Sequence, residues 1–198
     1  MIPDSERGRS EQKQTAGATG RSRRDRTDEG KADRAYSVIG DDYPLGVCSM
    51  TELSGVWSKD EIVAFFDRTT VPLRLACNTP SGRLWVVSLW YVFEDDTLRC
   101  ATGANADIVG LLRNDSTVAF EISTNDPPYS GVRGNGTTSV EPDPEKDLLR
   151  ELLRRYLGGT DSRLARRLLS DDRTEVTIRI EPDRLHSWDF TQRMADAS

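Results

Sequence analysis

The stretch between Leu73 and Ile122 limits the fold more than any other part of this chain. Short apolar runs follow one another there: Leu-Ala-Cys-Asn-Thr at 75–79, Val-Val-Ser-Leu-Trp-Tyr at 86–91, Cys-Ala-Thr at 100–102 and Val-Ala-Phe-Glu-Ile at 118–122. Runs of this length and composition indicate β-strands, and the segments at 79–82 and 94–96 have residues typical of tight turns. We therefore expect a small β-barrel with one inserted helix.

The rest of the chain extends this expectation to a mainly β fold. Strands are predicted at about 72–78, 83–93, 97–102, 117–123, 131–141, 175–181 and 185–190. Helices are predicted at 58–69, with a Ser58/Glu61 capping box, at 104–113, at 161–169, and from Asp143, as N-cap before Pro144, to a stop at Gly158-Gly159. The pattern favours a split β-barrel of Greek-key type, with six or seven mostly antiparallel strands and helices covering its ends.

The predicted strand at 83–93 is unusual because it is apolar on both faces. Trp85, Val87, Leu89 and Tyr91 alternate with Val86, Trp90 and Val92. This pattern is typical of a strand that packs inward and is covered outside by an interface or a helix.

Charge and composition divide the chain at about residue 34. Residues 1–34 carry a net charge of +2 and almost no large apolar side chain, so we expect a disordered tail. Residues 35–198 form the expected domain, begin with an ordered lead-in at 36–56 and carry a net charge of −8. A surface of that sign repels phosphate backbones, which argues against nucleic acid as a partner.

Cysteine and histidine usage narrows the function classes further. Cys48, Cys77 and Cys100 have no zinc-site spacing, and the single histidine, His186, cannot build a multi-histidine metal centre. We also find no apolar run suited to a signal peptide or a membrane span. We expect a reduced, cytoplasmic protein without a metal or a membrane partner.

An enzyme with so few acid–base groups needs a cofactor that carries the reaction. The sequence has no Walker loop, no dinucleotide-binding glycine motif after a strand and no nucleophile elbow. Gly134-Asn-Gly136 is glycine-rich but lies in a strand pattern, where a β-bulge is expected and an anion-binding nest is the alternative. A flavin suits such a chain, because it requires backbone amides and apolar or aromatic side chains.

Residues 62–194 resemble the pyridoxamine 5′-phosphate oxidase-like, FMN-binding split-barrel family, in an uncharacterised bacterial and archaeal subgroup. The resemblance rests on the strand at 86–91, on Ala101-Thr102, on the segment from Tyr129 to Gly134 and on Ile-Glu-Pro-Asp-Arg-Leu-His-Ser-Trp at 180–188. It implies that the flavin lies along the backbone of the 86–91 strand and close to Thr102 and Trp188. The cofactor-binding residues that it implies on these elements are Val87, Ser88, Leu89, Trp90, Thr102 and Trp188.

The resemblance also shows which cations are missing. Family oxidases carry Arg or Lys at the positions matching Val86, Tyr91, Asp107 and Ile108, two of which neutralise the flavin phosphate. Arg133 is the first candidate to replace them, because an arginine on the neighbouring strand can bind a phosphate with two N–H groups. Arg74 is the second candidate.

The function implied by the resemblance is that of an FMN-dependent oxidoreductase, which transfers a hydride at flavin N5 to or from an unidentified small-molecule substrate. The alternative is a flavin-, deazaflavin- or haem-binding module that acts as a carrier or sensor, and a third possibility is a barrel that has lost its ligand. The resemblance also implies a homodimer with two flavin sites in its interface. Catalytic residues and the substrate stay unassigned.

Overall fold

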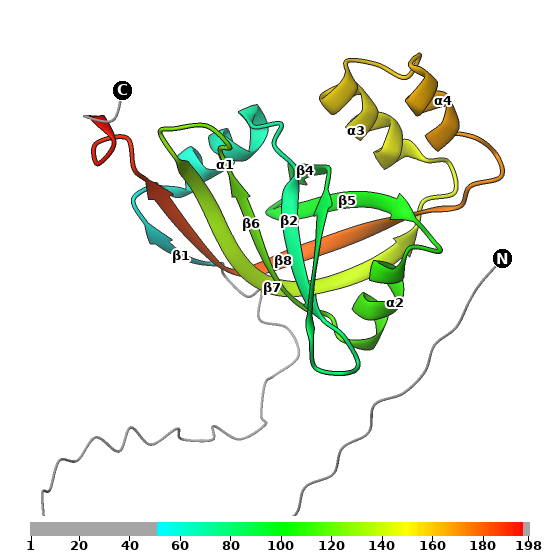
Figure 1. The fold of residues 1–198 in the computed structure, drawn as a ribbon, viewed down its shortest axis with the longest axis horizontal. Helices are drawn as coiled ribbons and strands as arrows, with labels where there is room; N and C mark the ends of the chain where they lie inside the picture. The colour runs from blue at the N-terminus through cyan, green and yellow to red at the C-terminus, as the bar shows by residue number, and fades with distance from the viewer. Residues whose placement is uncertain (1–50, 196–198) are drawn as a thin grey trace, which may run out of the picture. The chain divides into compact units, whose positions relative to one another are not determined.

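Eight strands form one curled sheet in the computed structural model, which describes residues 51–195 (Figure 1). The strands are β1 (Glu52–Gly55), β2 (Leu73–Asn78), β3 (Leu84–Leu89), β4 (Tyr91–Glu94), β5 (Thr97–Gly103), β6 (Thr117–Ser123), β7 (Ser130–Pro142) and β8 (Glu175–Asp189). The helices are α1 (Lys59–Arg68), α2 (Asp107–Asn114), α3 (Asp147–Leu157) and α4 (Arg163–Leu168). The predicted tail at 1–34 and most of the predicted lead-in lie outside the described residues.

The sheet has the order β3-β2-β6-β7-β8-β5-β4, in which all neighbours are antiparallel. The short strand β1 adds to β8 in parallel. Strands β3 and β4 stand at opposite ends of this order, yet only Trp90 separates them in the chain. The two ends of the sheet must therefore meet, which confirms the predicted split β-barrel.

The predicted strand at 83–93 is thus two strands, because its pairing changes from β2 to β5 at Trp90. Trp90 turns toward α3, where its ring stacks on Tyr156 with centroids 5.1 Å apart and planes 12° from parallel. Only the β4 half is covered as expected: Tyr91 and Val92 are buried, whereas Leu84 and Val86 of β3 are exposed.

The two strands predicted at 175–181 and 185–190 are one strand, β8, because β7 pairs with both segments across a β-bulge. Asn135 lies opposite Arg184 and Gly136 lies opposite Pro182, so Asp183 is an extra residue at this point. The bulged residue is thus in β8, opposite the glycine-rich segment of β7 in which a β-bulge was expected.

Helix boundaries follow local capping. Ser58 and Glu61 form the predicted capping box of α1, and Gly158 ends α3 with a φ of 74°. The prediction that α3 begins after Asp143 is wrong: residues 143–146 form a turn, because Lys146 has a left-handed backbone, with a φ of 57°. The Asp143 carboxylate instead accepts a hydrogen bond from the backbone N–H of Asp147 at 3.0 Å.

The core fills the barrel and the space beneath α1 and α2. Its most deeply buried large side chains include Phe65 and Phe66 of α1, Leu75, Tyr91, Ile122 and Ile178. Cys77 and Cys100 are free and buried, as expected, and burial raises the pKa of the Cys100 thiol to about 12. Neither thiol is therefore a reactive group in the folded chain.

Arg155 attaches α3 to the end of α1. Its guanidinium donates to the carbonyl oxygens of Phe66, at 2.6 Å, and Thr69, at 2.9 Å, and the Tyr91 hydroxyl donates to the same two oxygens. The carbonyl end of a helix carries partial negative charge, so a cation placed there stabilises both helices.

Candidate functional site

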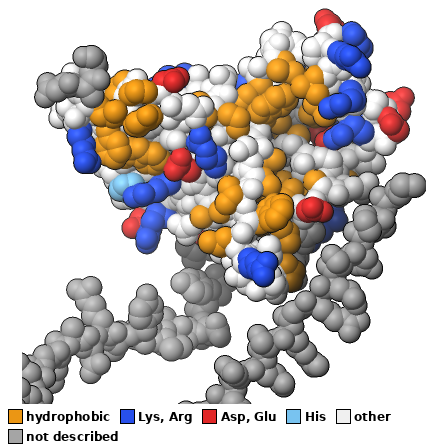
Figure 2. Space-filling view, viewed as in Figure 1, with side chains coloured by type: hydrophobic (Ala, Val, Ile, Leu, Met, Phe, Trp, Pro, Cys, Tyr) orange, Lys and Arg blue, Asp and Glu red, His pale blue; other side chains and the backbone are white. Residues whose placement is uncertain are grey.

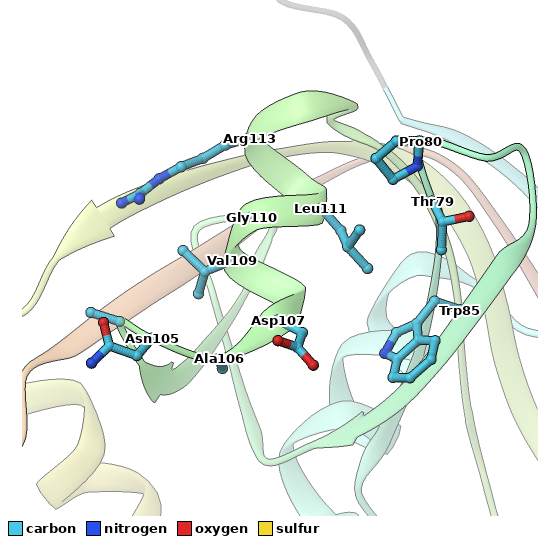
Figure 3. A pocket seen from close by; sticks show the side chains of 11 residues that line it. Thr79, Pro80, Trp85, Asn105, Ala106, Asp107, Val109, Gly110, Leu111 and Arg113 are labelled. Atoms are coloured by element: carbon cyan, nitrogen blue, oxygen red, sulfur yellow. The ribbon is translucent and has the colours of Figure 1, made fainter.

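Three cavities adjoin on one side of the barrel, where β3 and β5 approach the start of α2. The first, about 610 Å³, lies between α2 and the β2–β3 hairpin (Figure 3). The second, about 380 Å³, lies between residues 102–106 and 172–174, and the third, about 220 Å³, lies under α3 beside residues 88–90. The first and second share residues 104–106, and the second and third share Thr102, Gly103 and Arg173, so together they form one cleft.

The structure brings four of the predicted cofactor-binding residues together in this cleft. Ser88 and Leu89 of β3, Trp90 and Thr102 all line the third cavity. Val87 also lies on β3, but its side chain packs against the barrel core and only its backbone runs beside the cleft. One face of the Trp90 ring is already covered by Tyr156.

The first cavity contains an aromatic side chain that sequence analysis did not single out. Trp85 of β3 is 46% exposed and faces Asp107 at the start of α2. Figure 3 shows Leu111 directed toward Trp85 and Thr79, whereas Arg113 extends away from them. The apolar pattern on both faces of the strand was the only sequence signal for this exposed tryptophan.

Arg173 is the second residue that sequence analysis missed. It lies in the segment before β8 and lines both the second and third cavities. A Cβ atom added to Gly103 would lie 3.2 Å from an Arg173 guanidinium nitrogen, so the guanidinium approaches the β5 backbone closely. The carboxylate of Glu175, which is only 2% exposed, holds it at 2.9 Å.

The charge of the cleft is mixed and mostly acidic. Asp107, Asp172 and Glu175 line it, together with Arg113 and Arg173. A side-chain hydrogen bond with Ser170 lowers the pKa of Asp172, so this carboxyl group is ionised at neutral pH. An anionic ligand group therefore finds one well-placed guanidinium here, beside two carboxylates.

The other predicted cofactor-binding residues, Arg74, Arg133 and Trp188, lie outside this cleft. Arg74 and Arg133 line a separate hollow of about 460 Å³ on the outer face of β2, β6, β7 and β8. Trp188 lies next to it, with its ring 5.8 Å from the Arg133 guanidinium carbon. Within one chain, these residues do not share a cavity with Thr102.

Two further features, a metal-binding cluster and a membrane-spanning helix, are absent from the part of the chain that the structure describes. Residues 51–195 contain no cluster of three or more His, Cys, Asp or Glu side chains that could hold a metal ion. None of the helices in the same range combines the length and the apolar character needed to cross a bilayer.

Comparison with solved structures decides the fold. The chain is similar to Rv2991, a conserved hypothetical protein from Mycobacterium tuberculosis, with 24% identity and a TM-score of 0.57 over 71% of this chain and 89% of the other. The chain has the split β-barrel fold of the pyridoxamine 5′-phosphate oxidase-like proteins.

Two more solved structures share this split barrel. An F420 reductase matches with 22% identity and a TM-score of 0.51, covering 62% of this chain and 93% of its own. A Listeria innocua protein with the provisional name pyridoxamine 5′-phosphate oxidase matches with 18% identity and a TM-score of 0.50, covering 65% and 95%. Comparisons with protein-family models and with curated proteins find no match.

Proposed function

We propose that the cleft binds a flavin and that the protein is an FMN-dependent oxidoreductase acting on a small molecule. The observation that carries the proposal is the adjoining series of cavities, which runs from Ser88-Leu89-Trp90 past Thr102 to the start of α2. Their volumes lie in or near the range of small-molecule sites, and their walls are formed by apolar side chains with a few polar groups. Names of two solved structures with this fold, a reductase and an oxidase, favour redox chemistry.

The ring and the phosphate of the cofactor fit the cleft unequally. Backbone groups of residues 88–90 and the side chains of Leu89 and Thr102 suit an isoalloxazine ring and its ribityl chain. For the phosphate, Arg173 is the cation that lines the second and third cavities, but Glu175 already pairs with it and Asp172 lies beside it. We therefore expect the ring to supply most of the affinity and the phosphate to add little.

Bound flavin would supply hydride transfer at its N5 position, while the residues of this chain orient it and exclude water. The alternative, a carrier or sensor of flavin, deazaflavin or haem without turnover, is favoured by one observation. The ionisable groups that line the cleft are Asp107, Arg113, Asp172, Arg173 and Glu175, and Glu175 is buried in an ion pair. The described residues that line the cleft include no histidine, cysteine, tyrosine or lysine that could act as a proton donor.

The test is reconstitution of the full chain with FMN, riboflavin or haem, followed by absorbance spectra after removal of free ligand. We expect the flavin band at about 450 nm, and reduction of bound flavin by a pyridine nucleotide would favour the enzyme over the carrier. A chain that stays colourless with FMN and riboflavin, or that acquires only a haem spectrum, would overturn the proposal.

The phosphate argument gives a sharper measurement. Glu175→Gln removes the carboxylate that faces Arg173 while keeping its shape, so FMN affinity should rise several-fold relative to riboflavin affinity. Glu181→Gln, which removes the exposed partner of Arg179 outside the cleft, is the matched control and should leave that ratio unchanged. An unchanged ratio in Glu175→Gln would show that Arg173 does not bind the phosphate.

A further inference from the structure

A further cavity, of about 700 Å³, lies between β1, the start of α1, the β4–β5 hairpin and the middle of β8. Strand β5 runs from this cavity to the flavin cleft, because Thr97 at its start lines the cavity and Thr102 near its end lines the cleft. Figure 1 shows α1 and β1 to the left and α2 and α3 to the right. The residues that line this cavity include none of β3 and none that the family resemblance assigns to the flavin.

The inner wall of this cavity is apolar. Ile62 and Leu185, which are 1% and 5% exposed, form part of it, and Val63 and Phe93 line it as partly exposed side chains. The Phe93 ring packs against the Phe66 ring with centroids 4.9 Å apart, so its position is fixed from the core side. A volume and a wall of this kind are typical of sites for small molecules with an apolar part.

The charged side chains of the same cavity do not balance. Six of them line it, and four form two ion pairs: Lys59–Asp96 at 2.8 Å and Arg179–Glu181 at 3.2 Å. The other two are Asp95 and Asp183, and no lysine or arginine within residues 51–195 pairs with either of them. The lining therefore has two carboxylates in excess, and the potential inside it favours a cation.

Both of these carboxylates stand at irregular positions of the backbone. Asp183 is the extra residue of the bulge in β8, and bulges redirect side chains. Asp95 and Asp96 are the two turn residues of the β4–β5 hairpin, with left-handed φ angles of 51° and 57°. Glycine fits such positions with less strain than aspartate. Two separate departures from regular strand geometry thus bring carboxylates to one apolar cavity.

We propose that this cavity is a binding site for an organic cation, a small molecule that joins an ammonium group to an apolar body. Asp95 and Asp183 attract the ammonium group, while Phe93, Val63 and Leu185 contact the apolar body. The site is separate from the flavin cleft, so this proposal and the flavin proposal can fail independently.

The experiment titrates the full-length protein with four probes that share a benzyl or phenyl group: benzylamine, benzyltrimethylammonium, the uncharged benzyl alcohol and the anion benzoate. Calorimetry measures the affinity, and carbon-13 spectra follow the methyl signals of Ile62 and Val63. We expect saturable binding of one or both cations, binding of benzyl alcohol that is weaker by about tenfold, no binding of benzoate, and a shift of both methyl signals. The stronger of the two cations identifies a primary or a quaternary ammonium group as the preferred one.

Charge and volume are tested by separate variants. Asp95→Asn and Asp183→Asn keep the side-chain shape and should each weaken cation binding by about two- to fivefold, the range of an exposed charge pair. The double variant should bind benzylamine no better than benzyl alcohol. Val63→Trp fills the cavity without changing its charge and should abolish binding. Asp161→Asn, which removes an exposed carboxylate just before α4, is the matched control and should bind as the parent does.

The proposal is overturned if neither cation binds saturably, if benzoate binds as tightly as benzylamine, or if the double variant keeps the preference for the cation. Undiminished binding by folded Val63→Trp has the same meaning. Saturating FMN should leave benzylamine binding unchanged, and competition between the two would overturn the separate site. Circular dichroism and unfolding curves establish that each variant is folded, and the two exposed aspartate positions decide the matter should Val63→Trp fail to fold.

Discussion

Single residues decide how the helices attach to the barrel, and Arg155 is the clearest case. Its two hydrogen bonds to the end of α1 and its position over the Tyr91 ring join three elements. Arg154, its neighbour on α3, is exposed. The sequence shows both as arginines on one helix, and nothing in their spacing separates the structural one from the solvated one.

We predict that Arg155→Ala lowers the free energy of unfolding by about 1–3 kcal/mol, because two carbonyl oxygens lose a charged donor. Urea unfolding measures this, and Arg154→Ala should change it by less than about 0.5 kcal/mol. Equal effects of the two substitutions would show that the contact to α1 contributes nothing.

At the residue scale, a structural feature could be predicted from the sequence where the residues that form it are close together in the chain. The Ser58/Glu61 capping box and the end of α3 at Gly158 were predicted because each depends on residues within one turn. Arg173 and Trp85 were missed because their roles depend on β5 and α2, which reach them only in the folded chain.

Elements formed where the sequence indicated them, but pairing determined where several begin and end. Strands β2, β5, β6 and β7 match the predicted runs closely. The run at 83–93 divides because its two halves pair with different strands, and the runs at 175–181 and 185–190 join because β7 pairs with both. Apolar alternation carries no information about a partner strand, so neither result was accessible from the pattern.

The bulge between β7 and β8 gives the prediction at this scale. A Cβ atom at Gly136 would lie 2.1 Å from the Glu181 carbonyl oxygen, so Gly136→Ala must displace backbone. We expect it to lower the free energy of unfolding by about 1–3 kcal/mol. Gly110→Ala on α2, where an added Cβ meets nothing within 4 Å, should raise it by about 0.5–1 kcal/mol.

Both variants are compared by urea unfolding under the same conditions. A loss in Gly136→Ala no larger than the gain in Gly110→Ala is the result that contradicts the prediction, since it would mean that the bulge relaxes freely.

At the scale of the whole molecule, the predicted split barrel is confirmed, whereas the flavin site and the assembly are still predictions. Leu84, Trp85 and Val86 of β3 are 75%, 46% and 63% exposed, and Figure 2 shows apolar side chains gathered low on this face. Within the described residues β3 pairs only with β2, so its outer edge is free. An exposed apolar strand of this kind suits burial against a second copy.

We predict a homodimer at micromolar concentration, with β3 in its interface. Sedimentation equilibrium measures the mass, and Leu84→Asp should shift the chain toward monomer because a charge would be buried. Leu164→Asp, at an exposed leucine on α4, should leave the mass unchanged. A parent chain that sediments only as monomer refutes the prediction.

The single residue between β3 and β4 has a wider consequence. Because one continuous stretch of backbone forms both end strands of the sheet, Trp90 is the link that closes the barrel. The junction between these two strands lies along the proposed cofactor cleft. A cofactor lying against Ser88 of β3 and Thr102 of β5, the strand next to β4, would connect the two ends of the sheet. Cofactor binding and closure of the barrel would then be coupled.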